Sequence, residues 1–301
     1  MQPTVITHAD PDGIIALSLF YQNLMSFKCN VFLSSAYRLK DTLLTAIRRK
    51  FLNQLYIFDL TGSAQIVPLL LFFKNVVWID HHIWPEIKKP ENVEFFIDSK
   101  AKSATELVGK YFNIKSELIE IANEIDTNNI KSEKAQFLRN LIASIKWKYP
   151  ADFNKLKNIA KVLAISGIER LERSKNTVQI INEYIEWIKN LEKDVLNKVY
   201  ISNVNGKKIA IYESKGNVPV YVITDKLAEH KEWPFDIIAV LIKKDVEEKV
   251  ISKVELRTNT NTDVYNIAAS FGGGGHKTAS SFTLPKAINA KELLKLLSVT
   301  Q

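Results

Sequence analysis

Short apolar runs that end in acidic or histidine residues most constrain the fold of this chain. Residues 4–7 (TVIT) lead into HADPDG, residues 55–58 (LYIF) lead into Asp59, and residues 76–79 (VVWI) lead into DHH. Helix-like stretches over 14–24, 41–51 and 64–73 separate these runs from one another and from a further apolar run at 30–34. Strands that alternate with helices predict an α/β fold with a parallel sheet covered on both faces.

The polar residues that follow these strands are predicted to meet at one edge of the sheet, because ligands of open parallel sheets bind outside the carboxyl ends of the strands. Several carboxylates in one small volume repel each other, and divalent cations remove that conflict. Carboxylate and imidazole ligands together favour manganese or another first-row metal, and the excess of acids suggests two ions that share a carboxylate. The residues concerned are His8, Asp10, Asp12, Asp59, Asp80, His81 and His82.

Simpler roles stay open for single members of this set. An Asp after a strand is commonly a helix N-cap, and this alternative applies to Asp12 and Asp59. A lone histidine is usually structural. Three acidic loops at three strand ends, two of them with histidine, favour the metal site over these alternatives.

The C-terminal part has its own α/β pattern. Strands are predicted over 208–212, 218–223, 236–242 and 249–256, and a helix over 263–271. Four glycines and His276 follow, and such a run lets backbone amides approach a ligand, although flexible linkers are also rich in glycine. Its place between apolar segments favours a nucleotide-binding loop. Before it, residues 176–195 predict an amphipathic connecting helix in preference to a coiled-coil seam.

These motifs resemble those of the DHH phosphoesterase superfamily. The residues that match are HADPDG at 8–13, Asp59, the DHH triplet at 80–82, and Asp126 in EIDTN. SFGGGGHKTA at 270–279 resembles the glycine-rich, histidine-bearing motif of the nucleotide-binding domain attached to many DHH enzymes, and Arg257 in VELR resembles its substrate-binding arginine. Ser280 and Ser281 depart from the family, which often has a second glycine there.

The resemblance covers nearly the whole chain and implies domains and roles. A DHH catalytic domain is expected over 1–175, a linker helix over 176–200 and a smaller C-terminal nucleotide-binding domain over 201–301. Asp59 would bridge two manganese ions, Asp80 would orient an imidazole, and His82 would face the scissile phosphate as donor or acid. The other implied ligands are His8 and Asp10 for one ion and Asp12, His81 and Asp126 for the other. The implied substrate-binding residues are Arg257, Gly273, Gly274, Gly275 and His276.

The function expected from this resemblance is that of a metal-dependent phosphodiesterase. It would act as an exonuclease on single-stranded or short oligonucleotides and release 5′-mononucleotides, as in nanoRNases and archaeal helicase-associated nucleases. One alternative is an enzyme for a small nucleotide such as 3′-phosphoadenosine-5′-phosphate or a cyclic dinucleotide. The other is an inactive replication or repair scaffold. A helicase, a repair or replication protein, and a second copy of the chain remain open as partners.

Composition agrees with these expectations. The formal net charge of +8 suits a polyanionic partner, although a lysine-rich solvated surface explains it equally well. No apolar run reaches the roughly 20 residues that span a bilayer, and no signal peptide is visible, so no membrane association is expected. Cys29 is the single cysteine, which excludes an internal disulfide and favours the cytoplasm.

Overall fold

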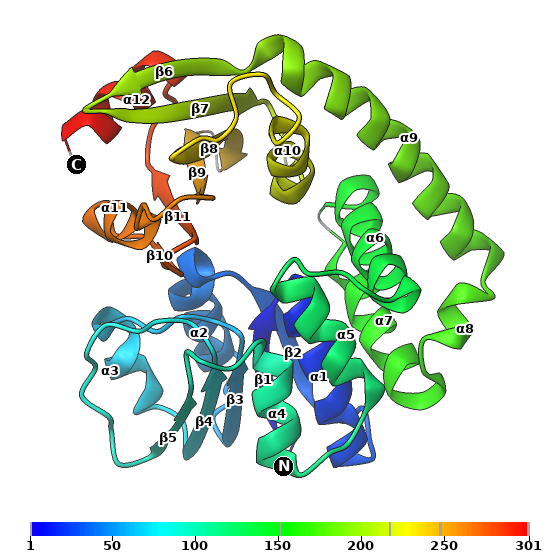
Figure 1. Cartoon of the computed structure of the whole chain (residues 1–301). Coiled ribbons are helices and arrows are strands. Elements are labelled where there is room, and N and C mark those ends of the chain that lie inside the picture. Colours follow the sequence, from blue (N-terminus) through cyan, green and yellow to red (C-terminus); the bar gives the residue numbers. More distant parts are fainter. Residues whose placement is uncertain (1, 151, 217, 247–248, 300–301) are drawn as a thin grey trace. The chain divides into compact units, whose positions relative to one another are not determined.

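The computed structural model of this 301-residue chain describes residues 2–150, 152–216, 218–246 and 249–299. The chain divides into two compact units, residues 1–184 (unit 1) and 185–301 (unit 2), and each has its own sheet (Figure 1). The predicted fold class is confirmed, because unit 1 contains a parallel sheet and the smaller unit 2 has a second α/β arrangement.

Unit 1 is built on a parallel five-stranded sheet in the order β2-β1-β3-β4-β5. Its strands are β1 (Thr4–His8), β2 (Asn30–Ser34), β3 (Gln54–Phe58), β4 (Asn75–Asp80) and β5 (Val93–Ile97). Four of these strands were predicted from their apolar runs, whereas β5 is a short edge strand with a charged residue inside it. The strand order reverses between β1 and β3, which is the point where ligands bind in open α/β sheets.

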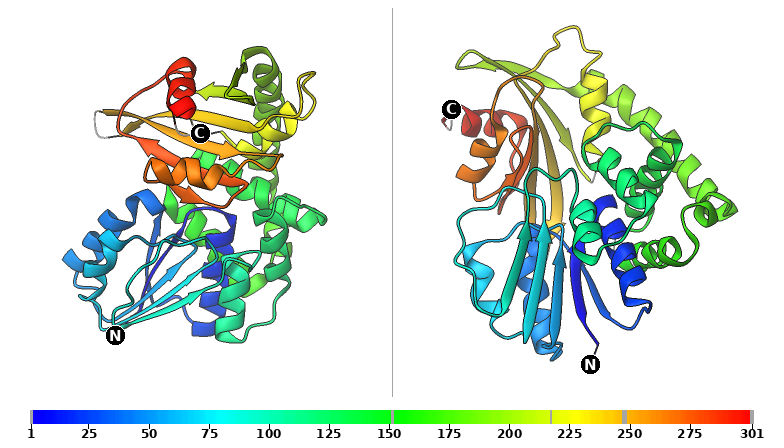
Figure 2. Two further views of the ribbon diagram at one scale, coloured as in Figure 1. Left: turned by 60° about the vertical axis from the view of Figure 1, so that its left-hand side comes forward. Right: turned by 60° about the horizontal axis from the view of Figure 1, so that its bottom comes forward.

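Helices cover both faces of this sheet (Figure 2). On one face lie α2 (Leu39–Arg48) and the short η2 (Ala64–Ile66) and α3 (Val67–Leu70), whose apolar residues pack against the strands. The predicted helix over 64–73 is therefore shorter than expected, because the chain turns after Leu70 to enter β4. On the other face lie α1 (Pro11–Leu24), α4 (Ala104–Phe112) and α5 (Glu117–Asp126), and η1 (Ala36–Arg38) links β2 to α2.

Three more helices complete unit 1 before a long helix joins the two units. They are α6 (Glu133–Lys148), α7 (Phe153–Ser166) and α8 (Glu169–Glu172). The long helix α9 (Lys175–Lys198) spans the boundary between the units, and its Leu191 and Val195 belong to the core of unit 2. Among the described residues, no helix combines the length and apolar character that a membrane span requires.

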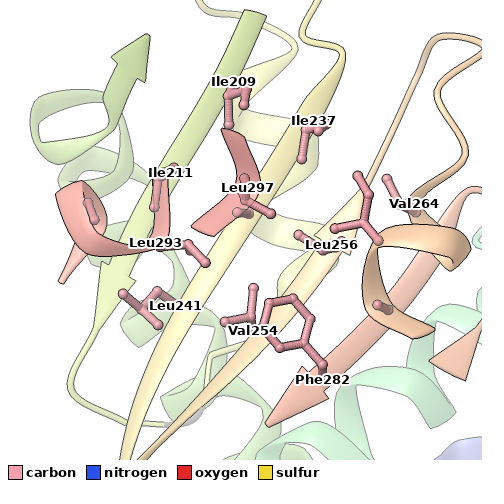
Figure 3. Close-up of a cluster of buried hydrophobic side chains, with 14 of the residues drawn as sticks. Ile209, Ile211, Ile237, Leu241, Val254, Leu256, Val264, Phe282, Leu293 and Leu297 are labelled. Carbon is pink, nitrogen blue, oxygen red and sulfur yellow. The ribbon is translucent and has the colours of Figure 1, made fainter. Parts of the chain in front are cut away.

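Unit 2 contains a six-stranded sheet in the order β10-β11-β9-β8-β7-β6, in which only β7 and β8 pair in parallel among the described residues. The strands are β6 (Tyr200–Val204), β7 (Lys207–Ser214), β8 (Ile237–Val246), β9 (Lys249–Arg257), β10 (Gly274–Gly275) and β11 (Ala279–Leu284). Side chains of α11 (Val264–Ser270) and α12 (Ala290–Val299), with Leu293 of α12 among them, pack on one face of this sheet against Leu256 and Phe282 (Figure 3). The end of α9 packs on the other face.

One predicted strand of unit 2 is wrong. Residues 218–223 were predicted as a strand, but the chain forms helix α10 (Val220–Leu227) there. Pro219 takes the N-cap position, and Val222, Ile223 and Leu227 are buried against the sheet. The β-branched composition of this segment suggested a strand, but the packing of a helical face against β7 and β8 outweighs that weak local preference.

Candidate metal centre

The acidic and histidine residues of unit 1 gather at the carboxyl edge of its sheet, at the reversal between β1 and β3. His8 is the last residue of β1, Asp59 follows β3 directly, and Asp80 is the last residue of β4. The Asp59 backbone N–H donates to the carbonyl of Ile79 on β4, which ties these two strand ends together. Asp126 arrives from further along the chain, as the last residue of α5.

One group of potential metal ligands consists of His8, Asp10 and Asp59, whose ligand atoms all lie within 4.8 Å of one another. His8 Nδ1 lies 2.7 Å from Asp10 Oδ2 and 3.4 Å from Asp59 Oδ2. Asp10 is also the N-cap of α1, because its carboxylate accepts a hydrogen bond from the Gly13 amide. The N-cap role considered for Asp12 therefore belongs to Asp10.

A second group consists of Asp12, Asp59 and His81, so Asp59 belongs to both groups. His81 Nε2 lies 3.6 Å from Asp59 Oδ1, 3.7 Å from Asp12 Oδ2 and 3.4 Å from Asp126 Oδ2. Asp12, Asp59 and His81 are almost completely buried, whereas Asp126 is partly exposed. The structure thus brings together all six residues that were proposed as ligands. Five of them form two groups that meet at Asp59, and Asp126 lies beside His81 of the second group.

The N-terminus of α4 holds the Asp12 carboxylate, which the sequence did not indicate. The amides of Ala104 and Thr105 donate to its two oxygens over 2.6 and 2.8 Å, and the Thr105 hydroxyl donates to the Asp12 carbonyl. Amides at a helix N-terminus favour a negative charge. Ser103 caps the same helix, and its hydroxyl donates to Asn123 on α5.

Asp80 and His82 form a hydrogen-bonded pair, and with Asp59 they make a third group whose ligand atoms lie within 4.8 Å of one another. Asp80 is completely buried, and its Oδ1 lies 2.7 Å from His82 Nδ1. Its other oxygen accepts a hydrogen bond from the indole N–H of Trp84 over 2.5 Å. Both Asp80 oxygens are therefore engaged by neighbouring side chains, which suits the orienting role that the resemblance implied. Trp84 was not identified from the sequence, where it is simply the second residue after the DHH triplet.

The electrostatics of the cluster reflect its crowded carboxylates. Burial and the charges of Asp59 and Asp126 raise the pKa of Asp12 well above its ordinary value. Burial raises the pKa of Asp126 to about 7, with the charge of His81 opposing this rise and that of Asp59 adding to it. Burial lowers the pKa of His81, but Asp59, Asp12 and Asp126 outweigh it and raise this pKa to about 11.

These residues fit a divalent cation. Asp59 Oδ2 is buried and accepts no hydrogen bond from any described residue. Two imidazoles and four carboxylates form a mixed nitrogen and oxygen donor set, which suits manganese and neighbouring first-row metals. Positive charge at this edge would also relieve the repulsion that raises the carboxylate pKa values. His8, Asp10, Asp12, Asp59, His81 and Asp126 are the residues that could hold such ions.

In unit 2, the residues proposed to bind substrate lie at one end of the sheet. Arg257 ends β9 and pairs with Ala279, the first residue of β11, while His276 lies in the turn between β10 and β11. Arg257 Nη1 donates to the Leu256 carbonyl and lies 3.5 Å from Glu255 Oε2. The sequence did not indicate Glu255, whose carboxylate also pairs with Lys253.

The glycine run has a packing role that sequence reasoning missed. A Cβ at Gly273 would lie 2.1 Å from the Ser281 carbonyl oxygen, and Gly275 adopts a φ of 135°. These two positions need glycine because the backbone passes close to β11. A Cβ at Gly274 would meet nothing within 4 Å, so this glycine is the one of the three with open space. Ser280, where the sequence departs from the family, donates to the His276 carbonyl and stabilises the turn.

Comparison with known proteins agrees with this description. Residues 205–299 match the family model of the DHHA1 domain. A search of curated protein sequences gives no match. The chain as a whole shares its two-domain fold with solved structures that include PggH and RecJ.

Three solved structures illustrate the shared fold. The pGpG-specific phosphodiesterase PggH from Vibrio cholerae has a TM-score of 0.57 at 12% identity, with 99% of this chain and 98% of that chain covered. The DHH domain of a protein described as a member of a ribosomal protein family gives 0.61 at 18% identity, over 99% and 86%. RecJ from Thermus thermophilus, in complex with Mn²⁺, gives 0.53 at 13% identity, over 99% and 51%.

Proposed function

We propose that this chain is a metal-dependent DHH phosphodiesterase that acts as an exonuclease on single-stranded or short oligonucleotides and releases 5′-mononucleotides. The observation that supports this most strongly is the pair of ligand groups that share Asp59 at the carboxyl edge of the sheet. In this proposal, His8, Asp10 and Asp59 hold one divalent ion, and Asp12, Asp59, His81 and Asp126 hold the other. Manganese is the proposed metal, in line with the donor set and with the Mn²⁺ in the RecJ structure.

The proposed chemistry divides between the ions and the side chains. Paired divalent ions supply charge neutralisation of a phosphate and activation of a water molecule. His82, held by Asp80, donates a hydrogen bond to the scissile phosphate or a proton to the leaving 3′ oxygen. The α4 amides keep the Asp12 carboxylate in a fixed orientation. In unit 2, Arg257, His276 and the open Gly274 bind a terminal phosphate or base of the substrate.

A linear dinucleotide or another small nucleotide is a second substrate class. PggH, which has the same fold, is a pGpG-specific phosphodiesterase, and pGpG contains a single phosphodiester bond between two nucleotides. The net charge of +8 favours longer, more strongly anionic substrates. We also propose a protein partner. A helicase or a replication or repair protein would fit, because these proteins work where single strands are exposed, and a second copy of this chain is the other candidate.

Hydrolysis assays with added Mn²⁺ test this function. The substrates are end-labelled RNA and DNA single strands of graded length, pGpG, 3′-phosphoadenosine-5′-phosphate and a cyclic dinucleotide. Stepwise release of mononucleotides from strands, abolished by Asp59→Asn and by a chelator, would support the exonuclease. Turnover of the small nucleotides alone would favour the second substrate class over oligonucleotides. Absence of any metal-dependent turnover would contradict the proposed enzymatic function.

A further inference from the structure

Asp80 is bound differently from the other carboxylates of the centre. Its side chain has no exposed surface, and each of its oxygens has its own donor, His82 for Oδ1 and Trp84 for Oδ2. A buried carboxylate is costly unless both oxygens are hydrogen-bonded. If the indole N–H were removed, Oδ2 would be left buried without this partner, and the carboxylate would no longer be held in one orientation.

The indole of Trp84 is fixed on several sides. Its ring lies 4.7 Å from that of Trp78 and 5.2 Å from that of Phe95, in edge contacts at 75° and 66°. On a third side it lies against Gly62, where a Cβ would be 2.5 Å from the indole Cζ3. The same aromatic group holds the loop after β3, because the Trp78 indole N–H donates to the Leu60 carbonyl. The position of the Trp84 N–H is therefore set by packing rather than by the hydrogen bond alone.

The packing of Trp84 also affects the orientation of His82, through Asp80. A hydrogen bond to Asp80 keeps a proton on His82 Nδ1 and directs the opposite nitrogen, Nε2, away from Asp80. Partners of this kind orient an imidazole, and their loss typically costs about 10- to 100-fold in activity or metal affinity at metal sites. The hydrogen bond of Trp84 goes to Asp80, which is not one of the six proposed ligands and is hydrogen-bonded to His82, so its loss should act mainly through His82.

We propose that Trp84 is a positioning residue for phosphodiester hydrolysis, which clamps the Asp80 carboxylate so that His82 meets the substrate phosphate in one orientation. This inference rests on the proposed function. Gly62 contributes to this positioning, because its lack of a side chain leaves the space that the Trp84 indole occupies.

Steady-state kinetics of the full chain test this inference. Trp84→Phe removes the N–H and keeps an aromatic ring, and we expect kcat to fall about 10- to 100-fold with KM and Mn²⁺ affinity unchanged. Gly62→Ala displaces the indole while leaving Trp84, Asp80 and His82 intact, and it should reproduce that loss. Trp147→Phe is the matched control, since it makes the same change at a tryptophan that packs on Tyr184, and its kcat should match the wild type.

A double-mutant comparison separates positioning from general damage to the fold. In a His82→Gln background, Trp84→Phe should reduce the residual kcat no further, because its effect passes through His82. An unchanged kcat in Trp84→Phe, or equal losses in both backgrounds, would overturn the proposal.

An NMR measurement on the metal-free protein does not depend on activity. With ¹⁵N-labelled histidine, the His82 Nδ1–H should be protected from solvent exchange in the wild type and lose that protection in Trp84→Phe. Unchanged protection would reject the clamp. If the wild type cleaves no phosphodiester, the proposed function fails, and this spectrum still decides whether Trp84 positions His82.

Discussion

Asp59 combines a strained backbone with a carboxylate that belongs to both ligand groups. Its φ of 55° lies in the left-handed region, which a non-glycine residue adopts at a cost, although Asp and Asn tolerate it best. Strain of this kind gathers at functional sites. The buried Oδ2 of Asp59 accepts no hydrogen bond from the described residues but lies 3.4 Å from His8 Nδ1, so the imidazole balances its charge.

Replacing this carboxylate should separate stability from metal binding. In Asp59→Asn the left-handed backbone is still tolerated. The repulsion with Asp12 and Asp126 is reduced, but the attraction to the protonated His8 and His81 is lost, and because these two changes oppose each other the metal-free variant should unfold at a temperature close to that of the wild type. Mn²⁺ at 100 times its Kd should stabilise the wild type by about 2.7 kcal/mol and the variant hardly at all. Thermal unfolding with and without Mn²⁺ measures both effects. A metal-free variant that is clearly less stable would show that Asp59 serves the fold.

The histidines of the centre predict that metal binding is coupled to proton release. Burial lowers the pKa of His8, but Asp10 and Asp59 outweigh it and raise this pKa to about 10, and the pKa of His81 rises to about 11. Both imidazoles are therefore protonated at neutral pH in the metal-free protein and must lose a proton to bind an ion. Mn²⁺ affinity should rise with pH through the neutral range and up toward these pKa values. Titration calorimetry in two buffers of different ionisation enthalpy counts the protons released, and a heat that is independent of buffer would contradict this coupling.

At the scale of single elements, α4 links the fold to the metal centre. Its first amides hold Asp12, so a weaker helix start should weaken metal binding. Ser103→Ala removes the N-cap and should cost about 1 kcal/mol of stability together with a measurable loss of Mn²⁺ affinity. Ser132→Ala, which removes the N-cap of α6, should cost a similar amount and leave Mn²⁺ affinity unchanged. Equal Mn²⁺ affinities in the two variants would contradict the link between α4 and the site.

The glycine run of unit 2 separates packing from binding within one short segment. Gly273→Ala would bring a Cβ within 2.1 Å of the Ser281 carbonyl oxygen and should destabilise the protein by at least about 1–3 kcal/mol. Gly274→Ala has open space, so its unfolding temperature should match the wild type. If Gly274 borders the bound substrate, this second variant should raise KM while the fold stays intact. A Gly274→Ala protein with unchanged KM would remove Gly274 from the binding residues.

The elements that sequence reasoning found and missed differ in a physical way. β1, β3 and β4 are largely buried, so their apolar runs predict them directly, and the acids that follow them lie at one edge by the geometry of a parallel sheet. α10 was mistaken for a strand because its β-branched residues are helical only through packing on the sheet. Trp84 and Glu255 act through side chains that reach across loops or along a strand face, and no periodicity indicates such contacts.

At the scale of the whole molecule, the two units divide the proposed tasks. Each of the six proposed metal ligands lies between residues 8 and 126 and therefore in unit 1, whereas the DHHA1 match covers residues 205–299 of unit 2. These ligands are thus held by strand ends and helix ends of a single unit, around the same parallel sheet. Metal binding should accordingly be a property of unit 1 alone.

Hydrogen exchange of the full chain, followed by mass spectrometry, tests this division. Mn²⁺ should slow amide exchange at the ends of β1, β3 and β4 and at the N-terminus of α4, because the ions would stabilise the closed form of those segments against local opening. Exchange in β9, α11 and β11 should stay the same with Mn²⁺ alone. Those three elements should slow only when a nucleotide is added, and the Asp59→Asn protein allows that binding to be seen without turnover.

The same variant is the control for the metal effect, since Asp59→Asn should lose the Mn²⁺ protection in unit 1. Protection of unit 2 by Mn²⁺ alone would show that metal binding depends on both units. If unit 1 alone holds the ions, Mn²⁺ should not slow amide exchange in β9 or β11, because a ligand slows exchange only in segments whose opening would release it.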